Sequence, residues 1–331
     1  MGQESGAYRA LDAHLDSILP PERQTLGNSV IPTLLSSIGC ISTILRHAHS
    51  VSQVGSSNAF GDEQLNVDVL CEKAVRDALT QCPSIVTASS EEDPVERPVQ
   101  GETTTDKSQS PPQRSGETYT IAFDPLDGSS IIAANWTIGT IIGIWTVTRL
   151  FTKIHAKARS RRFLAFADRE PVQLSPFVCR NGRRKVILNT DIRFTPEASV
   201  KTRYFAPANL RAAASDSKYL ALVNHHIKEQ YTLRYSGGLV PDVVHMLVKG
   251  HGVFINPVSK ASKPKLRKLY ELFPVALVIE CAGGKAVNAD DGEPVLNQEV
   301  ADVEERGGFV CGTSEEVDFV VKTLVRGESI S

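Results

Sequence analysis

The spacing of apolar residues predicts helices in the first quarter of the chain. Apolar residues recur at helical spacing from Ile31 to Leu45, which predicts an amphipathic helix over Asn28–His47. A polar, glycine-bearing loop over Val51–Gly61 separates it from a second helix near Val67–Leu79. The apolar face of this second helix is expected to comprise Leu70, Ala74, Val75 and Ala78.

Runs of β-branched and apolar residues predict the strands. These runs are Ile85–Ala88, Tyr119–Phe123, Trp136–Val147 and Gly252–Ile255. The segment Pro94–Gly116 is rich in proline, threonine, serine and glutamine. We therefore expect it to be a surface insertion between the first two strands.

The helices of the second half are marked by their ends. One helix is expected to open at Pro241 and to end at Gly250, and two glycines stop another over Val275–Ala282. Thr313 and Glu316 have the spacing of a capping box, which predicts the start of a final helix.

Composition limits the class of protein. The chain has 331 residues and a formal net charge of −2, and 22% of its residues are charged. This length allows two domains that share a large core. The balanced charge gives no indication of binding to nucleic acid or to an anionic membrane. The longest apolar run, Ile131–Val147, is interrupted by Asn135 and Thr137, so no membrane-spanning segment is expected.

The cysteines are scattered, without the close spacing of metal-binding or redox pairs. They are Cys40, Cys71, Cys82, Cys179, Cys281 and Cys311. We expect reduced, structural thiols. Glu4 and Asp12 disfavour an organelle-targeting peptide, so a soluble protein of the cytoplasm is expected.

The segment Phe123–Ser130, FDPLDGSS, carries the clearest chemical signal. A turn after the predicted strand can direct Asp124, the Leu126 carbonyl and Asp127 at one point, and such oxygen ligands suit Mg²⁺. Gly128 and the two serines after it offer backbone N–H groups and hydroxyls that can hold a phosphate. Two aspartates at this spacing are more often a solvated turn, so the interpretation depends on further acidic residues.

Further acidic residues do occur in a comparable context. Glu91 and Glu92 follow the Ile85–Ala88 strand, and carboxylates crowded at a strand end are costly unless a cation or water neutralises them. Glu271 lies in the segment KLRKLYE, six residues after Lys265. The combination predicts a metal-assisted site for phosphoryl transfer or phosphate hydrolysis.

The segment Thr146–Arg203 does not fit the rest of the chain. It holds ten arginines and four lysines against four acidic residues, a net charge of +10. Three interpretations stay open: a nucleic-acid-binding arm, which lacks interleaved aromatic residues, a solvated basic insertion, and a frame or splicing error in the sequence. The absence of clear periodicity over Thr148–Asn181 favours the third.

Five motifs occur together and in order, and they carry a resemblance to a known family. They are NAFGDEQLNVDVL (58–70), SSEED (89–93), FDPLDGSS (123–130), LRYSGGLVPDV (233–243) and KLRKLYELFPVALVIECAGG (265–284). The chain resembles the class 1 fructose-1,6-bisphosphatases over residues 28–145 and 185–325. FAPANLRA (205–212), VPDV and VFINPVS make it most similar to the sedoheptulose-1,7-bisphosphatases.

The resemblance implies an α/β fold, a layered α/β/α/β/α sugar-phosphatase sandwich with the active site between two halves. Residues 1–200 would form a metal-binding α/β domain, in which 94–116 is the surface insertion and 146–184 is atypical. Residues 201–331 would form a substrate-binding α/β domain. The implied activity is Mg²⁺-dependent hydrolysis of the carbon-1 phosphate of sedoheptulose 1,7-bisphosphate or fructose 1,6-bisphosphate.

By the resemblance, two or three Mg²⁺ ions, or Mn²⁺, would be bound by acidic side chains and one carbonyl. The ligands would be Asp62, Glu91, Asp124, the carbonyl of Leu126, Asp127 and Glu271. Asp68 and Glu92 would activate the attacking water, because a carboxylate beside a metal-bound water can take its proton. Asp68 could also be an acid at a helix N-terminus, and Glu92 could orient its neighbours.

The resemblance also assigns substrate contacts at two phosphates. The contacts would be Asp127, Gly128, Ser129 and Ser130 at the 1-phosphate, and Asn209, Tyr235 and Lys265 at the far phosphate and sugar. Arg234 would reach across a subunit interface, which implies a homo-oligomer, a dimer or tetramer. Lys265 could instead be a solvated lysine in a lysine-rich stretch. No nucleic-acid or membrane partner is expected.

Some features depart from the family. Ala133 stands where an acidic residue usually follows DGSS, and the loop before FGDEQ lacks the redox cysteine pair of plastid relatives. No AMP-binding motif is recognisable, so neither a thioredoxin switch nor AMP inhibition is expected. The alternatives are an inositol-phosphate or nucleotide phosphatase of the same superfamily, and a catalytically impaired regulatory homologue. Tyr235 and Lys265 argue against the first; Ala133 and Thr146–Arg203 motivate the second.

Overall fold

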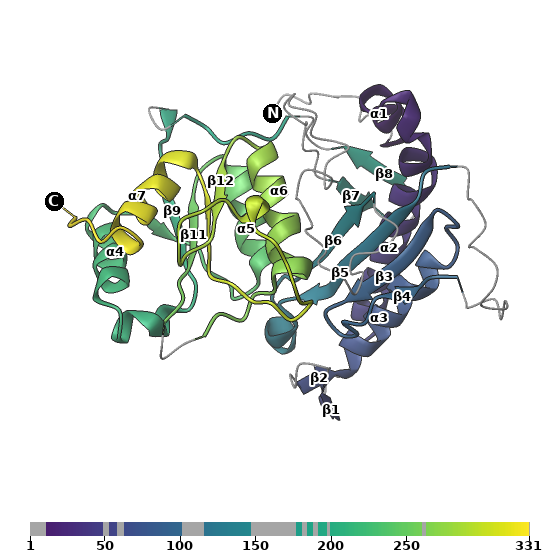
Figure 1. The fold of residues 1–331 in the computed structure, drawn as a ribbon, viewed down its shortest axis with the longest axis horizontal. Helices are drawn as coiled ribbons and strands as arrows, with labels where there is room; N and C mark the ends of the chain where they lie inside the picture. Colours follow the sequence, from purple (N-terminus) through teal and green to yellow (C-terminus); the bar gives the residue numbers. More distant parts are fainter. Residues whose placement is uncertain are drawn as a thin grey trace, which may run out of the picture.

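Two β-sheets, one in each half of the chain, organise the computed structural model (Figure 1). The structure describes residues 11–48, 53–57, 63–100, 116–146, 177–180, 184–187, 191–196, 199–259 and 263–330. Asp62, parts of the loop Val51–Gly61 and most of the atypical segment 146–184 therefore lie outside the described residues.

The sheet of the N-terminal half has the strand order β4-β3-β5-β6. Its strands are β3 (Ile85–Ser90), β4 (Arg97–Pro98), β5 (Tyr119–Asp127) and β6 (Gly139–Trp145). Strand β3 pairs parallel with β5, and β4 and β6 pair antiparallel with their neighbours. All nine residues of β5 are buried, which explains its nearly continuous apolar sequence. Strand β6 begins later than predicted, and Trp136 is half exposed.

Helices from the first part of the chain cover the outer face of this sheet (Figure 1). They are α2 (Ile31–His47) and α3 (Asn66–Leu79), and α1 (Leu11–Ile18) packs against the start of α2. The predicted apolar face of α3 is confirmed at Val75 and wrong at Leu70, which is 50% exposed. The buried stripe is Val67, Cys71, Val75 and Leu79, at steps of four residues. The cysteine completes this stripe as a small apolar side chain.

The helical stretch Pro21–His47 corrects the expectation that no segment could span a membrane. It has 27 residues, and an 18-residue window within it has a mean hydropathy of 1.4, so by length and composition alone it could cross a bilayer. This is weak evidence, since core helices of soluble proteins have the same properties. Its Leu34 and Ile41 lie in the core against α3 and the first sheet.

The sheet of the C-terminal half has five strands in the order β10-β9-β11-β13-β12. They are β9 (Tyr204–Pro207), β10 (Thr232–Leu233), β11 (Val253–Asn256), β12 (Lys285–Val287) and β13 (Phe309–Gly312). The first three pair parallel and the last two antiparallel. Two hairpins lie outside both sheets: β1 (Gln53–Ser57) with β2 (Glu63–Leu65), and β7 (Phe177–Arg180) with β8 (Arg184–Ile187).

Helices α5 (Leu239–Lys249) and α6 (Phe273–Cys281) lie between the two sheets, where they share a core with β6 on one side and β11 and β13 on the other (Figure 1). Helices α4 (Ser217–Lys228) and α7 (Ser314–Leu324) pack on the far face of the second sheet. This order of layers confirms the predicted α/β/α/β/α sandwich. A domain boundary near residue 200 stays a prediction.

Short helical turns connect these elements. They are η1 (Pro21–Arg23), η2 (Leu26–Val30), η3 (Ser129–Ala134), η6 (Leu210–Ala214), η7 (Lys268–Leu272) and η8 (Val295–Asn297). The predicted capping box before α7 is wrong. Thr313 uses its hydroxyl to accept the Gly252 N–H (3.1 Å), and Glu316 accepts the Tyr231 hydroxyl (2.7 Å) and faces His251 (3.2 Å). Tertiary partners thus replace the local cap.

Candidate active site

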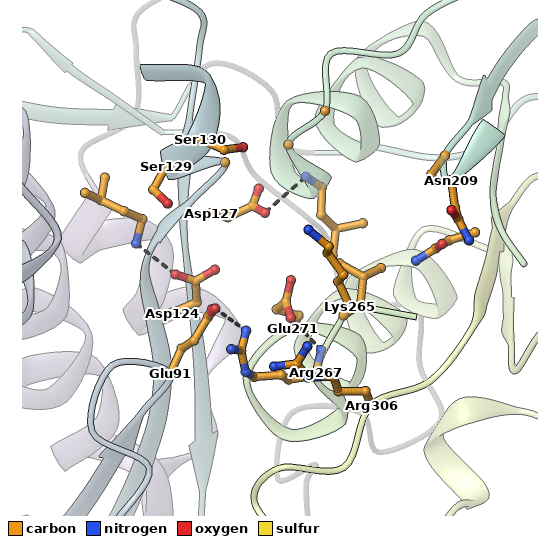
Figure 2. A pocket seen from close by; sticks show the side chains of 18 of the residues that line it. Glu91, Asp124, Asp127, Ser129, Ser130, Asn209, Lys265, Arg267, Glu271 and Arg306 are labelled. Carbon is orange, nitrogen blue, oxygen red and sulfur yellow. Dashed lines mark hydrogen bonds and ion pairs between the residues drawn. The ribbon is translucent and has the colours of Figure 1, made fainter. Parts of the chain in front are cut away.

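Two parallel strands bring acidic residues from distant parts of the chain together. Ser90 of β3 lies opposite Phe123 of β5, and the Glu91 N–H donates to the Phe123 carbonyl (3.0 Å). Because parallel neighbours end at the same edge of a sheet, Glu91 and Asp124 lie side by side. Glu271 lies on the turn η7 directly before α6 and completes a trio (Figure 2). One carboxylate oxygen from each of the three residues lies within 4.8 Å of the other two.

Two carboxylates of the trio are buried and that of Glu91 is half-buried, which makes the negative charge costly. Asp124 and Glu271 are 4% and 5% exposed. Burial raises the pKa of each carboxyl well above its usual value, and the neighbouring Glu91 raises both further. A divalent cation would remove this penalty, and a set of oxygen donors alone fits Mg²⁺ or Mn²⁺. The trio is therefore the candidate metal centre.

The turn predicted after Phe123 is instead a bulge between Asp124 and Asp127, because strand β5 continues through Asp127. The two aspartates have different partners, and Asp124 accepts the Leu126 N–H (2.9 Å) within the bulge. Both oxygens of Asp127 accept backbone N–H groups of the first turn of α5, from Leu239 (3.1 Å) and Val240 (2.5 Å). Asp127 therefore joins the two halves in this arrangement, and its role as a metal ligand stays a prediction.

Gly128 lets the two halves approach closely. Its φ is +86°, and a Cβ placed there would lie 3.2 Å from the Cα of Gly238, just before α5. Only glycine combines this left-handed backbone with such a close approach. Ser129 and Ser130 follow at the start of η3, and Figure 2 shows them beside Asp127.

One cavity of about 710 Å³ lies between the halves and is lined by almost all predicted site residues. Those that line it are Asp68, Glu91, Glu92, Asp124, Leu126, Asp127, Gly128, Ser129, Ser130, Asn209, Tyr235, Lys265 and Glu271. Their residue roles stay predictions, but the structure brings them to one place. Figure 2 shows the acidic residues on one side, Asn209 on the far side and Lys265 between them.

Asp68 satisfies both interpretations of its position. It is the third residue of α3, and its Oδ2 accepts the Leu65 N–H (2.9 Å) at the start of that helix. It also lines the cavity and is 2% exposed, and burial raises the pKa of its carboxyl to about 6. A carboxylate with this pKa suits a general base near neutral pH.

The far end of the cavity is built on loops and short turns. Asn209 has a left-handed backbone (φ 50°) and donates its side-chain amide to the Pro257 carbonyl (3.1 Å), which fixes it before η6. Tyr235 is 43% exposed, and Lys265 is exposed. The side chains of Tyr235 and Lys265 can therefore move to meet a ligand.

Five polar or charged lining residues were missed by the sequence analysis. They are Arg211, Asn256, Lys263, Arg267 and Arg306. Arg267 is only 4% exposed. Its guanidinium pairs with Glu91, and its backbone N–H donates to the Glu271 carboxylate (2.5 Å). Its place in KLRKLYE, two residues after Lys265, was the available signal, but lysines and arginines of that stretch resemble a solvated surface.

Arg234 does not line the cavity of its own chain. Its side chain is exposed and lies over the ring of Tyr204, with 5.8 Å between the guanidinium carbon and the ring centre. Arg234 is therefore not placed to contact a substrate in the cavity of its own chain. The reach of Arg234 into a neighbouring subunit stays a prediction.

Comparisons with known proteins give the family. The model "Fructose-1-6-bisphosphatase, N-terminal domain" matches residues 23–159, and "Fructose-1-6-bisphosphatase, C-terminal domain" matches residues 198–325. Residues 160–197, within the basic segment, lie outside both matches. A class 1 fructose-1,6-bisphosphatase of Syntrophotalea carbinolica is 33% identical over 284 residues, which cover 83% of this chain and 81% of that protein.

The chloroplastic sedoheptulose-1,7-bisphosphatase of Spinacia oleracea is 34% identical over 272 residues, 81% of this chain. The chain spans about two thirds of that relative, 66% of its length. Among solved structures, a Toxoplasma gondii protein assigned as a sedoheptulose-1,7 bisphosphatase has a TM-score of 0.82 and 30% identity, over 97% of this chain and all of that one. Leishmania major fructose-1,6-bisphosphatase shares the fold, with a TM-score of 0.75 at 22% identity over 97% of this chain and 100% of that one.

Proposed function

The chain belongs to the class 1 fructose-1,6-bisphosphatase family, and from this premise we propose that it hydrolyses the carbon-1 phosphate ester of a sugar bisphosphate. Sedoheptulose 1,7-bisphosphate is the first candidate and fructose 1,6-bisphosphate the second. The observation that carries the proposal is the polarity of the cavity. Its acidic end would bind metal and the scissile phosphate, and its cationic end would bind a second phosphate.

At the acidic end, Glu91, Asp124 and Glu271 would bind Mg²⁺, two or three ions in all, with the Leu126 carbonyl, Asp127 and Asp62 as further ligands. Mn²⁺ has the same ligand preference. The bound metal would supply charge neutralisation at the phosphate, a more acidic water and stabilisation of the leaving oxygen. Each Asp127 oxygen accepts one N–H from the first turn of α5 and keeps a second lone pair, so Asp127 can join without losing these bonds.

The protein's own residues would then carry the reaction. Asp68 and Glu92 line the cavity beside the trio and would take the proton of the attacking water as its oxygen bonds to phosphorus. The bond between phosphorus and the oxygen on carbon 1 breaks. The sugar leaves as an alkoxide and then takes up a proton. Gly128, Ser129 and Ser130 would hold the 1-phosphate through backbone N–H groups and hydroxyls.

At the cationic end, Asn209, Tyr235 and Lys265 would bind the far phosphate and the sugar. Arg211 and Lys263 line the same cavity, so the far end carries more positive charge than the family resemblance assigned. A dianionic phosphate suits such a group, because hydrogen bonds to a charged acceptor are about twice as strong as neutral ones. In this proposal residues 1–200 supply most of the metal ligands, and residues 201–331 supply Glu271 and the contacts to the rest of the substrate.

We expect the enzyme to act as a homo-oligomer. Arg234 is exposed, and so are three apolar side chains of the same half. They are Leu233 in the edge strand β10, which is 54% exposed, and Val244 and Val248 on one face of α5, which are 46% and 64% exposed. Tyr204 joins them, since its ring contacts His245 of α5 at 4.8 Å. A second copy on this surface would let Arg234 reach the partner's cavity. A location in the cytoplasm stays a prediction.

The test is phosphate release from four purified substrates, measured once with about 5 mM MgCl₂ and once with EDTA. We expect release from sedoheptulose 1,7-bisphosphate and fructose 1,6-bisphosphate only with Mg²⁺, and little from inositol 1-phosphate or a nucleoside 3′-phosphate. Faster release from either of the last two would overturn the substrate class. No release from any, by a folded protein that binds Mn²⁺, would favour the regulatory homologue.

A further inference from the structure

The acidic corner that carries Glu91 and Glu92 is attached to α3 through Arg76 and Glu72. Arg76 lies behind the corner, with its side chain 26% exposed. It pairs through Nε with Glu72, one turn earlier on α3, at 2.5 Å. Its Nη2 reaches the Asp93 carbonyl (3.4 Å), the Asp93 carboxylate (3.5 Å) and the Ser90 hydroxyl (3.5 Å).

The two residues that this arginine holds, Ser90 and Asp93, directly flank Glu91 and Glu92. The Ser90 hydroxyl donates to Glu72 (2.8 Å) and accepts the Asp93 N–H (3.0 Å), and the Ser90 N–H donates to the Asp93 carbonyl (3.1 Å). The corner is thus closed on itself and fixed to α3 at both ends. Its two glutamates are left to line the cavity.

The same guanidinium also contacts the second strand of the site. Its carbon lies 5.8 Å from the ring centre of Phe123, the residue before Asp124, in a cation–π arrangement. Phe123 in turn accepts the Glu91 N–H through its carbonyl (3.0 Å). One side chain therefore contacts both strand ends from which Glu91 and Asp124 project, in addition to the backbone pairing between them.

We propose that Arg76 is a positioning residue for the metal centre: it holds Ser90 and Asp93 so that the carboxylates of Glu91 and Asp124 meet at the spacing that a divalent cation needs. This inference rests on the proposed function, because it takes the trio as the metal ligands. Arg76 itself does not line the cavity and has no role in the chemistry.

The geometry requires arginine rather than any cation. A planar guanidinium can bond Glu72 along one edge and Asp93 along another while its face covers Phe123. A lysine ammonium is a single point charge and cannot satisfy all three at once. Residues that orient metal ligands commonly change metal affinity or activity about 10–100-fold when they are replaced.

The test is Mn²⁺ binding, followed by the electron paramagnetic resonance of free Mn²⁺, in the full chain with four variants. Arg76→Met and Arg76→Lys should each weaken Mn²⁺ affinity, about tenfold or more and severalfold respectively. The matched control is Lys73→Met on the same helix, whose side chain pairs with Asp77 at an exposed position. It should leave Mn²⁺ affinity unchanged.

The fourth variant separates positioning from folding. Arg76→Met leaves Glu72 without its cation, so Glu72→Gln with Arg76→Met removes that charge and should recover the melting temperature but not the Mn²⁺ affinity. A lowered melting temperature with wild-type Mn²⁺ affinity in Arg76→Lys and in the double variant would overturn the proposal. Because the readout is metal binding, it stands even if the wild-type protein hydrolyses none of the bisphosphates, a result that would contradict the proposed function alone.

Discussion

The two ends of the cavity are built in contrasting ways. At the acidic end, the carboxylates project from the ends of buried strands and from a buried turn, and Asp124 and Glu271 are almost completely covered. At the cationic end, Lys265 and Arg211 are exposed and come from loops or a short helical turn. The fold therefore fixes the geometry of the chemistry in advance, whereas the binding of the second phosphate depends on side chains that can adapt.

The largest effect is expected at the fixed end. Asp124→Asn should lower kcat about 1,000-fold, because a charge that stabilises the metal and the developing alkoxide is lost. The same change should leave or raise the melting temperature of the metal-free protein, since burial and Glu91 already make the charge of Asp124 costly. Phosphate release and thermal unfolding without metal measure the two effects. Full activity in the variant would contradict the assignment of this end to catalysis.

A smaller effect of a different kind is expected at the adaptable end. Lys265→Gln should raise KM for the bisphosphate about 10–100-fold with little change in kcat, because one charge-assisted contact to the far phosphate is lost. A sugar 1-phosphate, which lacks the far phosphate, is the control, and its kcat/KM should not change. Equal losses for the two substrates would show that Lys265 serves the reacting phosphate instead.

The pH profile should reflect the fixed end as well. Burial raises the pKa of the Asp68 carboxyl to about 6, and a base acts only when it is deprotonated. The rate should therefore fall about tenfold for each pH unit below a pKa of about 6 or slightly lower, since bound cations favour the charged form. Asp68→Asn should lower the rate at every pH, and the fall in rate at acidic pH should disappear from its profile. An unchanged profile in the variant would assign this fall to Glu92.

The smallest effect is expected far from the cavity. His226 is stacked on Phe205 at 5.0 Å, and burial lowers the pKa of its imidazole to about 4. An unfolded histidine has a pKa of about 6.5. Between these values the unfolded state binds more protons, so stability present above pH 6.5 is lost as pH falls toward 4.

His226→Phe should remove part of this acid sensitivity. The difference in melting temperature between pH 7 and pH 5 should shrink by about 2–4 °C in the variant. Kinetic constants at pH 7 should not change, because His226 lies on α4 in the outer layer. A pH dependence identical to that of the wild type would show that another group is responsible.

Much of the fold follows from local pattern, but the contacts between elements do not. Strands β3, β5 and β6 of the first sheet and the helix that Gly250 ends were predicted, because burial and turn chemistry act on neighbouring residues. Strand β4 was not, since it lies in the segment expected to be a surface insertion. The buried face of α3 was predicted wrongly, since Leu70 lies at helical spacing from other apolar residues but faces solvent. Only the packed structure decides which stripe is covered.

The candidate site shows the same limit. The acidic ligands stand out in the sequence because carboxylates are rare at strand ends, whereas the cations that position them resemble surface residues. Arg267 pairs with Glu91 across a separation of 176 residues, and Arg76 reaches Asp93 across 17. No spacing rule connects such pairs, so they could be found only once the two halves and α3 were seen together.

The most direct test of the account is anomalous scattering from Mn²⁺ in crystals of the protein. We expect at least one Mn²⁺ ion with oxygen atoms of Glu91, Asp124 and Glu271 at about 2.1–2.3 Å, displacing the guanidinium of Arg267 from Glu91. Mn²⁺ bound elsewhere, or an arrangement that keeps Arg267 on Glu91 with no ion among the three carboxylates at saturating Mn²⁺, would contradict a metal centre at the acidic end.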